Sequence, residues 1–333
     1  MEEDHQVEVL HRAENHQEAD IPQDVVILQE EAPTPATDTE PASIISPNND
    51  LHLCLKRGAA YHPWFQCFAV WIPDELRGEE AYRYYEAVYR ELLRQEQLHS
   101  DKLKICRCAS DFQEVQPSGK CGALFTVEGG AALGGKVERV ARLKACGVKA
   151  VTLTWNASCE IGDGAEVVHP KGLTPFGREV VRELERNRIA VDVSHASEPL
   201  FWDVAEQIEG PFLATHSDSR KLCGSLRNLT DEQFCTIRDR GGVVGVTFVR
   251  RFLDDSWQAG IEDVMRHIEH FLALGGENTV AIGGDFDGTD LPDGMTGVES
   301  VEALAECLLR HNYPETLVQA IFFDNAYRFF TSL

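Results

Sequence analysis

The chain of 333 residues is poor in basic residues and contains no long apolar run. It has 31 Lys and Arg against 55 Asp and Glu, which gives a formal net charge of -24. A face that binds nucleic acid or anionic lipid must be basic, so we expect neither as a partner. No segment approaches the roughly 18 apolar residues of a membrane span, and the first thirty residues lack the pattern of a signal peptide. These absences predict a cytoplasmic protein.

A paired CxxC framework is also missing. The ten cysteines are dispersed along the chain, which favours reduced thiols over disulfides. Cys106 and Cys108 form the one close pair, and two idle thiols are the commoner reading of such a pair.

The acid excess is concentrated at the start of the chain. Residues 1–40 hold twelve acidic residues and one basic residue, Arg12, and residues 32–47 are rich in Pro, Thr and Ser. This composition predicts a largely flexible extension over residues 1–47, followed by a barrel domain over 48–333. Within the extension, residues 25–29 are β-branched and apolar enough to form a short strand, which would be the first strand of the barrel.

From about residue 48, short β-branched runs alternate with amphipathic stretches, the pattern of a parallel sheet with crossover helices. Eight such strands indicate an α/β fold of the TIM-type (β/α)8 barrel class rather than a doubly wound sheet. The predicted strands are 25–29, 66–72, 123–128, 150–155, 189–195, 212–216, 243–248 and 279–285. The predicted helices are 78–98, 137–145, 175–187, 199–208, 231–239 and 261–274.

Four predicted strands end in residues that bind metals or move protons. These residues are Glu128, His195, His216 and Asp285. Because active sites of such barrels lie at the carboxyl ends of the strands, we expect the four side chains to converge. A lone His or Asp at a strand end is more often structural, but four at the same end favour a functional site. Glycines after Glu128 and before Asp285 would allow close approach of backbone or substrate.

The expected chemistry is metal-assisted hydrolysis. Glu128, His195 and His216 are suitable ligands for a divalent cation such as Zn²⁺, and Asp285 would then take a proton from the attacking water. By contrast, His267 and His270 form an i, i+3 pair on a predicted outer helix and lack the HExxH arrangement, so we expect no metal there.

Several longer stretches resemble the membrane (renal-type) dipeptidase family of zinc metallopeptidases, within the amidohydrolase-like barrels. The resemblance covers roughly residues 50–333 and looks closest to the bacterial, unanchored branch. The matching stretches include Val127-Glu128-Gly129-Gly130, Asp192-Val-Ser-His195, Thr215-His216-Ser217, Arg227-Asn228 and Ile282-Gly-Gly-Asp285-Phe-Asp-Gly288.

The resemblance implies a role for each matching residue. Glu128 would bridge two zinc ions, and His195 and His216 would bind the second. Asp285 would be the acid–base residue, and Arg227 would bind the carboxylate of the substrate. The implied reaction is hydrolysis of small dipeptides, including ones with a D-configured C-terminal residue, by an enzyme for which a homodimer is one possible assembly.

Two positions depart from the family pattern. The family begins with His-x-Asp, whose side chains hold the first zinc, whereas this chain has Gln29 and Glu31 at the corresponding positions. An amide is a poorer zinc ligand than an imidazole, so one zinc instead of two is an open alternative. At the position of Trp155 the animal members carry a His. The bacterial relatives resemble this chain there.

Two hypotheses therefore remain. The leading one is a zinc dipeptidase. The alternative is a catalytically degenerate barrel that binds a peptide or small acid without hydrolysing it. A different amidohydrolase is less favoured, because no lysine follows strand four to be carboxylated as a metal bridge.

Overall fold

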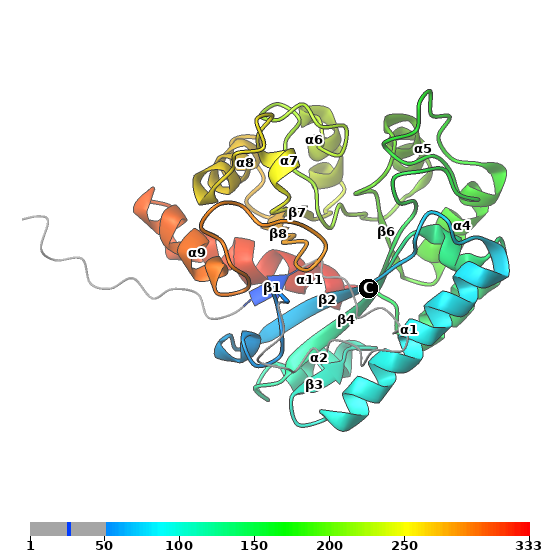
Figure 1. The fold of residues 1–333 in the computed structure, drawn as a ribbon, viewed down its shortest axis with the longest axis horizontal. Helices are drawn as coiled ribbons and strands as arrows, with labels where there is room; N and C mark the ends of the chain where they lie inside the picture. Colours follow the sequence, from blue (N-terminus) through cyan, green and yellow to red (C-terminus); the bar gives the residue numbers. More distant parts are fainter. Residues whose placement is uncertain (1–24, 28–50) are drawn as a thin grey trace, which may run out of the picture.

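The computed structural model describes residues 25–27 and 51–333, and a parallel sheet lies at its centre with helices around it (Figure 1). The strands follow the order β6-β5-β4-β2-β1-β8-β7. Ile27 of β1 pairs with Gln66 of β2 and with Ile282 of β8, so β1 joins the two halves of the sheet. The strands are β1 Val25–Ile27, β2 Trp64–Trp71, β3 Leu103–Ile105, β4 Cys121–Glu128, β5 Ala150–Thr152, β6 Ala190–Asp192, β7 Val244–Val246 and β8 Val280–Ile282.

The predicted strand at 212–216 closes the sheet between β6 and β7, although it forms only single bridges. Leu213 bridges to Asp192, and Ala214 bridges to Val244. The N–H of Leu213 donates to the carbonyl of Val191 at 3.1 Å, and that of Gly245 donates to the carbonyl of Ala214 at 2.8 Å. With this segment as the eighth member, the predicted (β/α)8 barrel is confirmed.

The helices follow the predicted ranges closely where capping residues mark their ends. Helix α6 starts after Thr230, whose hydroxyl accepts from the N–H of Gln233 while the Gln233 side chain accepts from the N–H of Thr230. Among the described residues the helices are α1 Gly78–Leu98, α2 Ala109–Val115, α3 Arg139–Cys146, α4 Pro175–Arg186, α5 Glu198–Gln207, α6 Asp231–Asp239, α7 Arg250–Leu253, α8 Ile261–Ala273, α9 Ser300–Arg310, α10 Glu315–Gln319 and α11 Asn325–Thr331.

Some elements were not predicted. Strand β3 pairs with the first half of β4, at Leu103 with Cys121, while β5 pairs with the second half. Short α2 and α7 and the C-terminal helices α9–α11 were also missed. None of the helices in residues 51–333 is long and apolar enough to cross a bilayer.

The C-terminal helices pack against the strands of the barrel. One apolar cluster gathers a buried side chain from each of six barrel strands with side chains from the last turns of the chain. Its members include Phe65, Leu124, Ala150, Ala190, Leu213, Ala281, Phe323, Phe329 and Phe330. The Nδ2 group of Asn325 anchors this region, because it donates to the carbonyl of Val280 on β8 at 2.8 Å. The interior is therefore a packed core, as in other barrels of this type.

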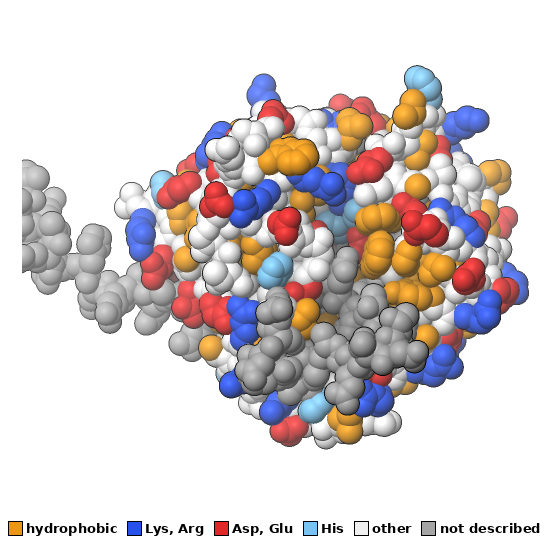
Figure 2. Space-filling model, viewed as in Figure 1, with side chains coloured by type: hydrophobic (Ala, Val, Ile, Leu, Met, Phe, Trp, Pro, Cys, Tyr) orange, Lys and Arg blue, Asp and Glu red, His pale blue; other side chains and the backbone are white. Residues whose placement is uncertain are grey.

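The described surface carries both signs of charge. On the face shown in Figure 2, acidic and basic side chains are interspersed with apolar ones. The predictions for residues 1–24 and 28–50, including Gln29 and Glu31, lie outside the described residues.

Candidate metal centre

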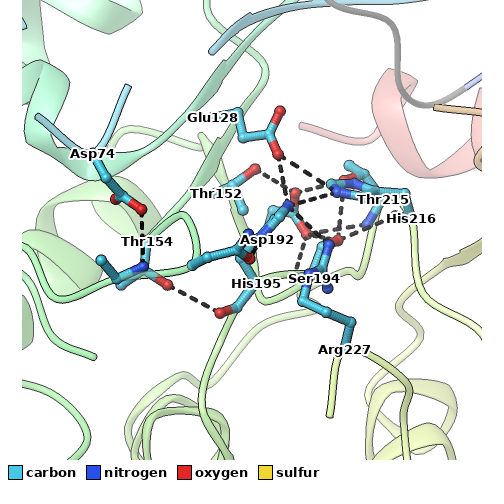
Figure 3. A network of polar contacts seen from close by, with 12 residues as sticks. Asp74, Glu128, Thr152, Thr154, Asp192, Ser194, His195, Thr215, His216 and Arg227 are labelled. Carbon is cyan, nitrogen blue, oxygen red and sulfur yellow. Dashed lines mark hydrogen bonds and ion pairs between the residues drawn. The ribbon is translucent and has the colours of Figure 1, made fainter. Parts of the chain in front are cut away.

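Three of the predicted site residues meet at the carboxyl ends of the strands (Figure 3). Glu128 is the last residue of β4, His195 follows β6, and His216 follows the bridges of Leu213 and Ala214. Nε2 of His195 lies 2.7 Å from Oε1 of Glu128 and 2.9 Å from Nε2 of His216. Nε2 of His216 lies 3.5 Å from the same carboxylate oxygen. Each residue thus offers one ligand atom to a common point, and all three side chains are buried.

Each imidazole is oriented by a hydrogen bond on its other nitrogen. Nδ1 of His195 lies 2.8 Å from Oδ1 of Asn156, and Nδ1 of His216 lies 2.8 Å from the hydroxyl of Thr215. Such partners fix ring direction in metal sites and raise the basicity of the ligand atom. Neither Asn156 nor Thr215 was singled out from the sequence. Their positions could have indicated them. Asn156 directly follows a predicted strand, and Thr215 lies within one, next to His216.

The surroundings keep both imidazoles neutral. Burial lowers the pKa of His195 well below its usual range, and the positive charge of Arg227 acts in the same direction. Burial, followed by the charge of Arg227, likewise lowers the pKa of His216. Neutral imidazole is the form that binds a metal ion.

Arg227 reaches the same cluster from the loop before α6. Its Nη2 lies 2.8 Å from Nε2 of His195, and its guanidinium lies 5.2 Å from the ring of Phe252. Burial lowers its pKa to about 10, although Glu128 and Asp285 oppose this effect. Its Nε and Nη1 atoms are buried and have no hydrogen-bond partner among the described residues. Two donors of a buried cation are therefore available to an anion.

Asp285 lies three residues beyond β8, in a left-handed backbone conformation with φ of 56°. Few residues other than glycine adopt this region, and such backbone outliers cluster at functional sites. Burial raises the pKa of Asp285 to about 6, while the charges of Arg227 and Arg251 act to lower it. The carboxyl group thus has the pKa range of a general base that works near neutral pH.

Two glycines beside these residues are required by the backbone geometry. Gly129 has a φ of 108°, which side chains rarely tolerate. A Cβ atom on Gly283 would lie 2.2 Å from the carbonyl oxygen of Thr215, so this position must be glycine for the strands to pack.

Residues that were expected to have ordinary roles are held in local contacts. His267 accepts from the N–H of Ser219 at 3.0 Å, with its Nε2 2.9 Å from the carbonyl of Leu253, and His270 pairs with Asp231. All ten cysteines are free. One further group of possible ligands lies on α8 and at the end of α9, with Glu262 and His311 exposed and Cys307 buried.

The closed barrel and the ligand cluster at its mouth define a (β/α)8 barrel protein with a candidate metal centre. The model of the membrane dipeptidase family, Peptidase family M19, matches residues 19–333. The chain belongs to this family, whose members are metal-dependent dipeptidases.

Two curated relatives are similar over about two thirds of the chain. An uncharacterized protein in the pqqA 5' region of Klebsiella pneumoniae is 32% identical over 245 residues, which is 70% of this chain and 90% of the relative. Dipeptidase 3 of Homo sapiens is 31% identical over 240 residues, which is 68% of this chain and 49% of the relative. The aligned part thus spans about half of the human protein.

Solved structures share the fold. The dipeptidase AC, a metallopeptidase of family M19, is 29% identical with a TM-score of 0.81, covering 86% of this chain and 91% of its own. A metallopeptidase from Rhodobacter sphaeroides, liganded with a phosphinate mimic of the dipeptide L-Ala-D-Ala, is 28% identical with a TM-score of 0.81, covering 86% and 92%. An amidohydrolase from Pseudomonas aeruginosa, 23% identical with a TM-score of 0.78, covers 92% and 95% and shows the common fold.

Proposed function

We propose that this protein is a zinc dipeptidase that hydrolyses the peptide bond of small dipeptides. The observation that carries the proposal is the meeting of Glu128, His195 and His216 with their ligand atoms 2.7–3.5 Å apart. Zinc bonds of about 2.0–2.1 Å in a tetrahedral site require ligand atoms roughly 3.3 Å apart. One carboxylate and two neutral imidazoles are also a ligand set that suits Zn²⁺. In their chemistry and their common meeting point the residues present therefore fit the metal, whose binding would move the two closest pairs of ligand atoms apart.

When bound, the metal would polarise the scissile carbonyl and lower the pKa of a water molecule. The chain's own residues do the remaining work. Asp285 takes the proton from the attacking water and passes it to the leaving amine. Arg227 binds the terminal carboxylate of the dipeptide through a charge-assisted hydrogen bond from Nη1, which has no other partner among the described residues.

The relatives support this substrate class. The Rhodobacter sphaeroides metallopeptidase takes a phosphinate mimic of L-Ala-D-Ala, and it shares 28% of its residues with this chain over 86% of the chain's length. We therefore propose small dipeptides, including ones with a D-configured C-terminal residue, as substrates.

A second candidate function rests on Gln29 and Glu31, which stand in the sequence where the resemblance expects His and Asp. If this change abolishes the first zinc position, the protein holds one zinc and binds a peptide or small acid without hydrolysing it. The variant Gln29→His/Glu31→Asp restores the expected pair and serves as the matched comparison.

Metal content and turnover together separate the two candidates. Purified protein is loaded with zinc, its metal content is measured by elemental analysis, and hydrolysis of a panel of L,L- and L,D-dipeptides is followed. Zinc with turnover in the natural chain supports the dipeptidase. Turnover that appears only in the restored variant, together with a second zinc, supports the degenerate barrel. Absence of zinc and turnover from both chains would contradict the enzyme altogether.

Three further properties belong to the same proposal. Residues 48–333 form the catalytic domain together with a strand from the acidic segment 1–47, the protein works in the cytoplasm, and it assembles as a homodimer. Sedimentation of the purified chain tests the assembly, and cell fractionation tests the location.

A further inference from the structure

The carboxylate of Asp192 is hydrogen-bonded to Ser194 and Thr215, the residues that precede His195 and His216. Asp192 is the last residue of β6 and is 1% exposed. Its Oδ1 accepts from the N–H groups of Ser194 and Thr215 at 3.0 Å each, and from the Ser194 hydroxyl at 2.7 Å. Its Oδ2 accepts from the hydroxyls of Thr152 and Thr215, both at 2.6 Å. Asp192 therefore acts only as an acceptor, with five donors on two oxygens (Figure 3).

These hydrogen bonds determine where the proton of His216 lies. A threonine hydroxyl has one hydrogen, and that of Thr215 points to Oδ2 of Asp192. The Thr215 oxygen can then only accept from Nδ1 of His216, 2.8 Å away. The neutral ring therefore carries its hydrogen on Nδ1 and a lone pair on Nε2, which lies 2.9 Å from Nε2 of His195 and 3.5 Å from Oε1 of Glu128.

We infer that Asp192 is a positioning residue that acts through Thr215 to hold His216 in the tautomer able to bind a metal. The inference rests on the proposed metal site. In many zinc sites a carboxylate accepts directly from the ligating histidine. Here the hydroxyl of Thr215 stands between the carboxylate of Asp192 and the imidazole of His216. Ser194 fixes the backbone next to this ring, because its hydroxyl accepts from the backbone N–H of His216 at 3.1 Å.

Replacement of Asp192 by Asn provides a sharp test. The NH₂ group of Asn cannot take the place of Oδ1, because two backbone N–H groups donate to that atom and donors would face donors. It must take the place of Oδ2, where the hydroxyls of Thr152 and Thr215 can turn and accept. The hydrogen of Thr215 is then free to point to Nδ1 of His216, which moves the ring hydrogen to Nε2.

Thr152 and Thr215 supply matched controls. Both hydroxyls donate to Oδ2 of Asp192 at 2.6 Å, but only that of Thr215 lies within hydrogen-bond distance of a site imidazole. Thr152→Val therefore removes an equal hydrogen bond from Asp192 without touching the chain to His216. Thr215→Val breaks the chain, and Thr215→Ser keeps its hydroxyl.

Two measurements report on the inference. In metal-free protein labelled with ¹⁵N-histidine, the ring nitrogen shifts show which nitrogen of His216 carries hydrogen, with signals assigned by their loss in His216→Gln. Zinc affinity is measured by competition with a chromophoric chelator. All titrations use a Cys307→Ser background, because the group formed by Glu262, Cys307 and His311 is another possible zinc site.

We expect the hydrogen on Nδ1 in the parent chain and a shift of population toward Nε2 in Asp192→Asn. Zinc affinity should fall about 10- to 100-fold in Asp192→Asn and Thr215→Val, the range found for lost outer partners of metal ligands, and stay within threefold of the parent in Thr152→Val and Thr215→Ser. An unchanged tautomer in Asp192→Asn, or an equal loss of affinity in Thr152→Val, overturns the inference. If the parent itself binds no zinc, the proposed function fails, whereas the tautomer measurement still decides the role of Asp192.

Discussion

Nη2 of Arg227 lies 2.8 Å from Nε2 of His195, the nitrogen that also faces Glu128. A guanidinium this close to a metal ligand leaves little room between the reacting carbonyl and the carboxylate that Arg227 would bind. One residue of extended chain spans only about 3.3–3.6 Å. The spacing therefore favours substrates with one residue after the scissile bond. A substrate that also has one residue before this bond is a dipeptide.

Arg227→Met should weaken the use of dipeptides by roughly 10- to 150-fold in kcat/KM, because hydrogen bonds to charged groups contribute about 1.5–3 kcal/mol. The measurement compares L-Ala-L-Ala with its C-terminal amide. The parent should strongly prefer the free acid, and the variant should treat both alike. A variant that retains the preference would show that another group binds the carboxylate.

Asp285→Asn should lower kcat by about 10²- to 10⁴-fold, the usual contribution of a general acid–base residue. Zinc content should stay at the parent level, because Asp285 is not among the three residues that share the ligand cluster. Elemental analysis beside steady-state kinetics checks both points. Loss of zinc together with activity would make Asp285 a ligand instead.

The acid limb of the pH profile should depend on Arg251. Burial raises the pKa of Asp285 to about 6, and the positive charge of Arg251 acts against this rise. Asp285 works as a carboxylate, so kcat/KM falls as the pH falls through its pKa. Removing the charge in Arg251→Gln should raise that pKa and move the acid limb to higher pH.

Arg250→Gln is the control for this experiment. Arg250 is adjacent in sequence but pairs with Asp293 at 2.7 Å, and its charge is not among the causes that shift the pKa of Asp285. Its profile should follow that of the parent. Equal shifts in both variants would indicate a general effect of net charge.

His267 should make the fold sensitive to acid. Burial lowers its pKa to about 4, against about 6.5 in an unfolded chain, so the unfolded state binds more protons between these values. Its contribution is complete above pH 6.5 and is lost as the pH falls toward 4, by about 3 kcal/mol in the free energy of unfolding. Urea unfolding of metal-free protein at pH 7.5 and 5 measures about 2 kcal/mol of this loss, because pH 5 lies between the two pKa values.

In His267→Gln the decrease between the two pH values should be smaller than in the parent. His270→Gln, one turn away on α8 and less buried, should retain the parental decrease. If all three chains lose stability equally, other groups govern the acid response.

The strand ends could be predicted because apolar β-branched runs stop at polar residues. This pattern identified Glu128, His195 and His216 as neighbours, and the structure brings them together. The 212–216 segment was predicted as a regular strand but forms only single bridges. Pro211, just before it, has no backbone N–H to donate to a ladder.

The remaining features depend on tertiary contacts that leave little local pattern. Strand β3 has only three residues, and it exists because β5 pairs with just the second half of β4. Asp192 lies within a predicted strand, where its five hydrogen bonds come from three separate segments of the chain. Its role follows from the donors and acceptors that surround it in the folded chain, and sequence spacing does not reveal these.

The pairing of β1 gives the acidic leading segment an unexpected importance. Ile27 pairs with both Gln66 and Ile282, so a protease that cut after this residue would remove the strand that joins β2 to β8. The cut would expose two strand edges at once, and open edges are templates for aggregation. Recombinant chains that start after residue 27 should therefore precipitate, and those that start before Val25 should remain dispersed.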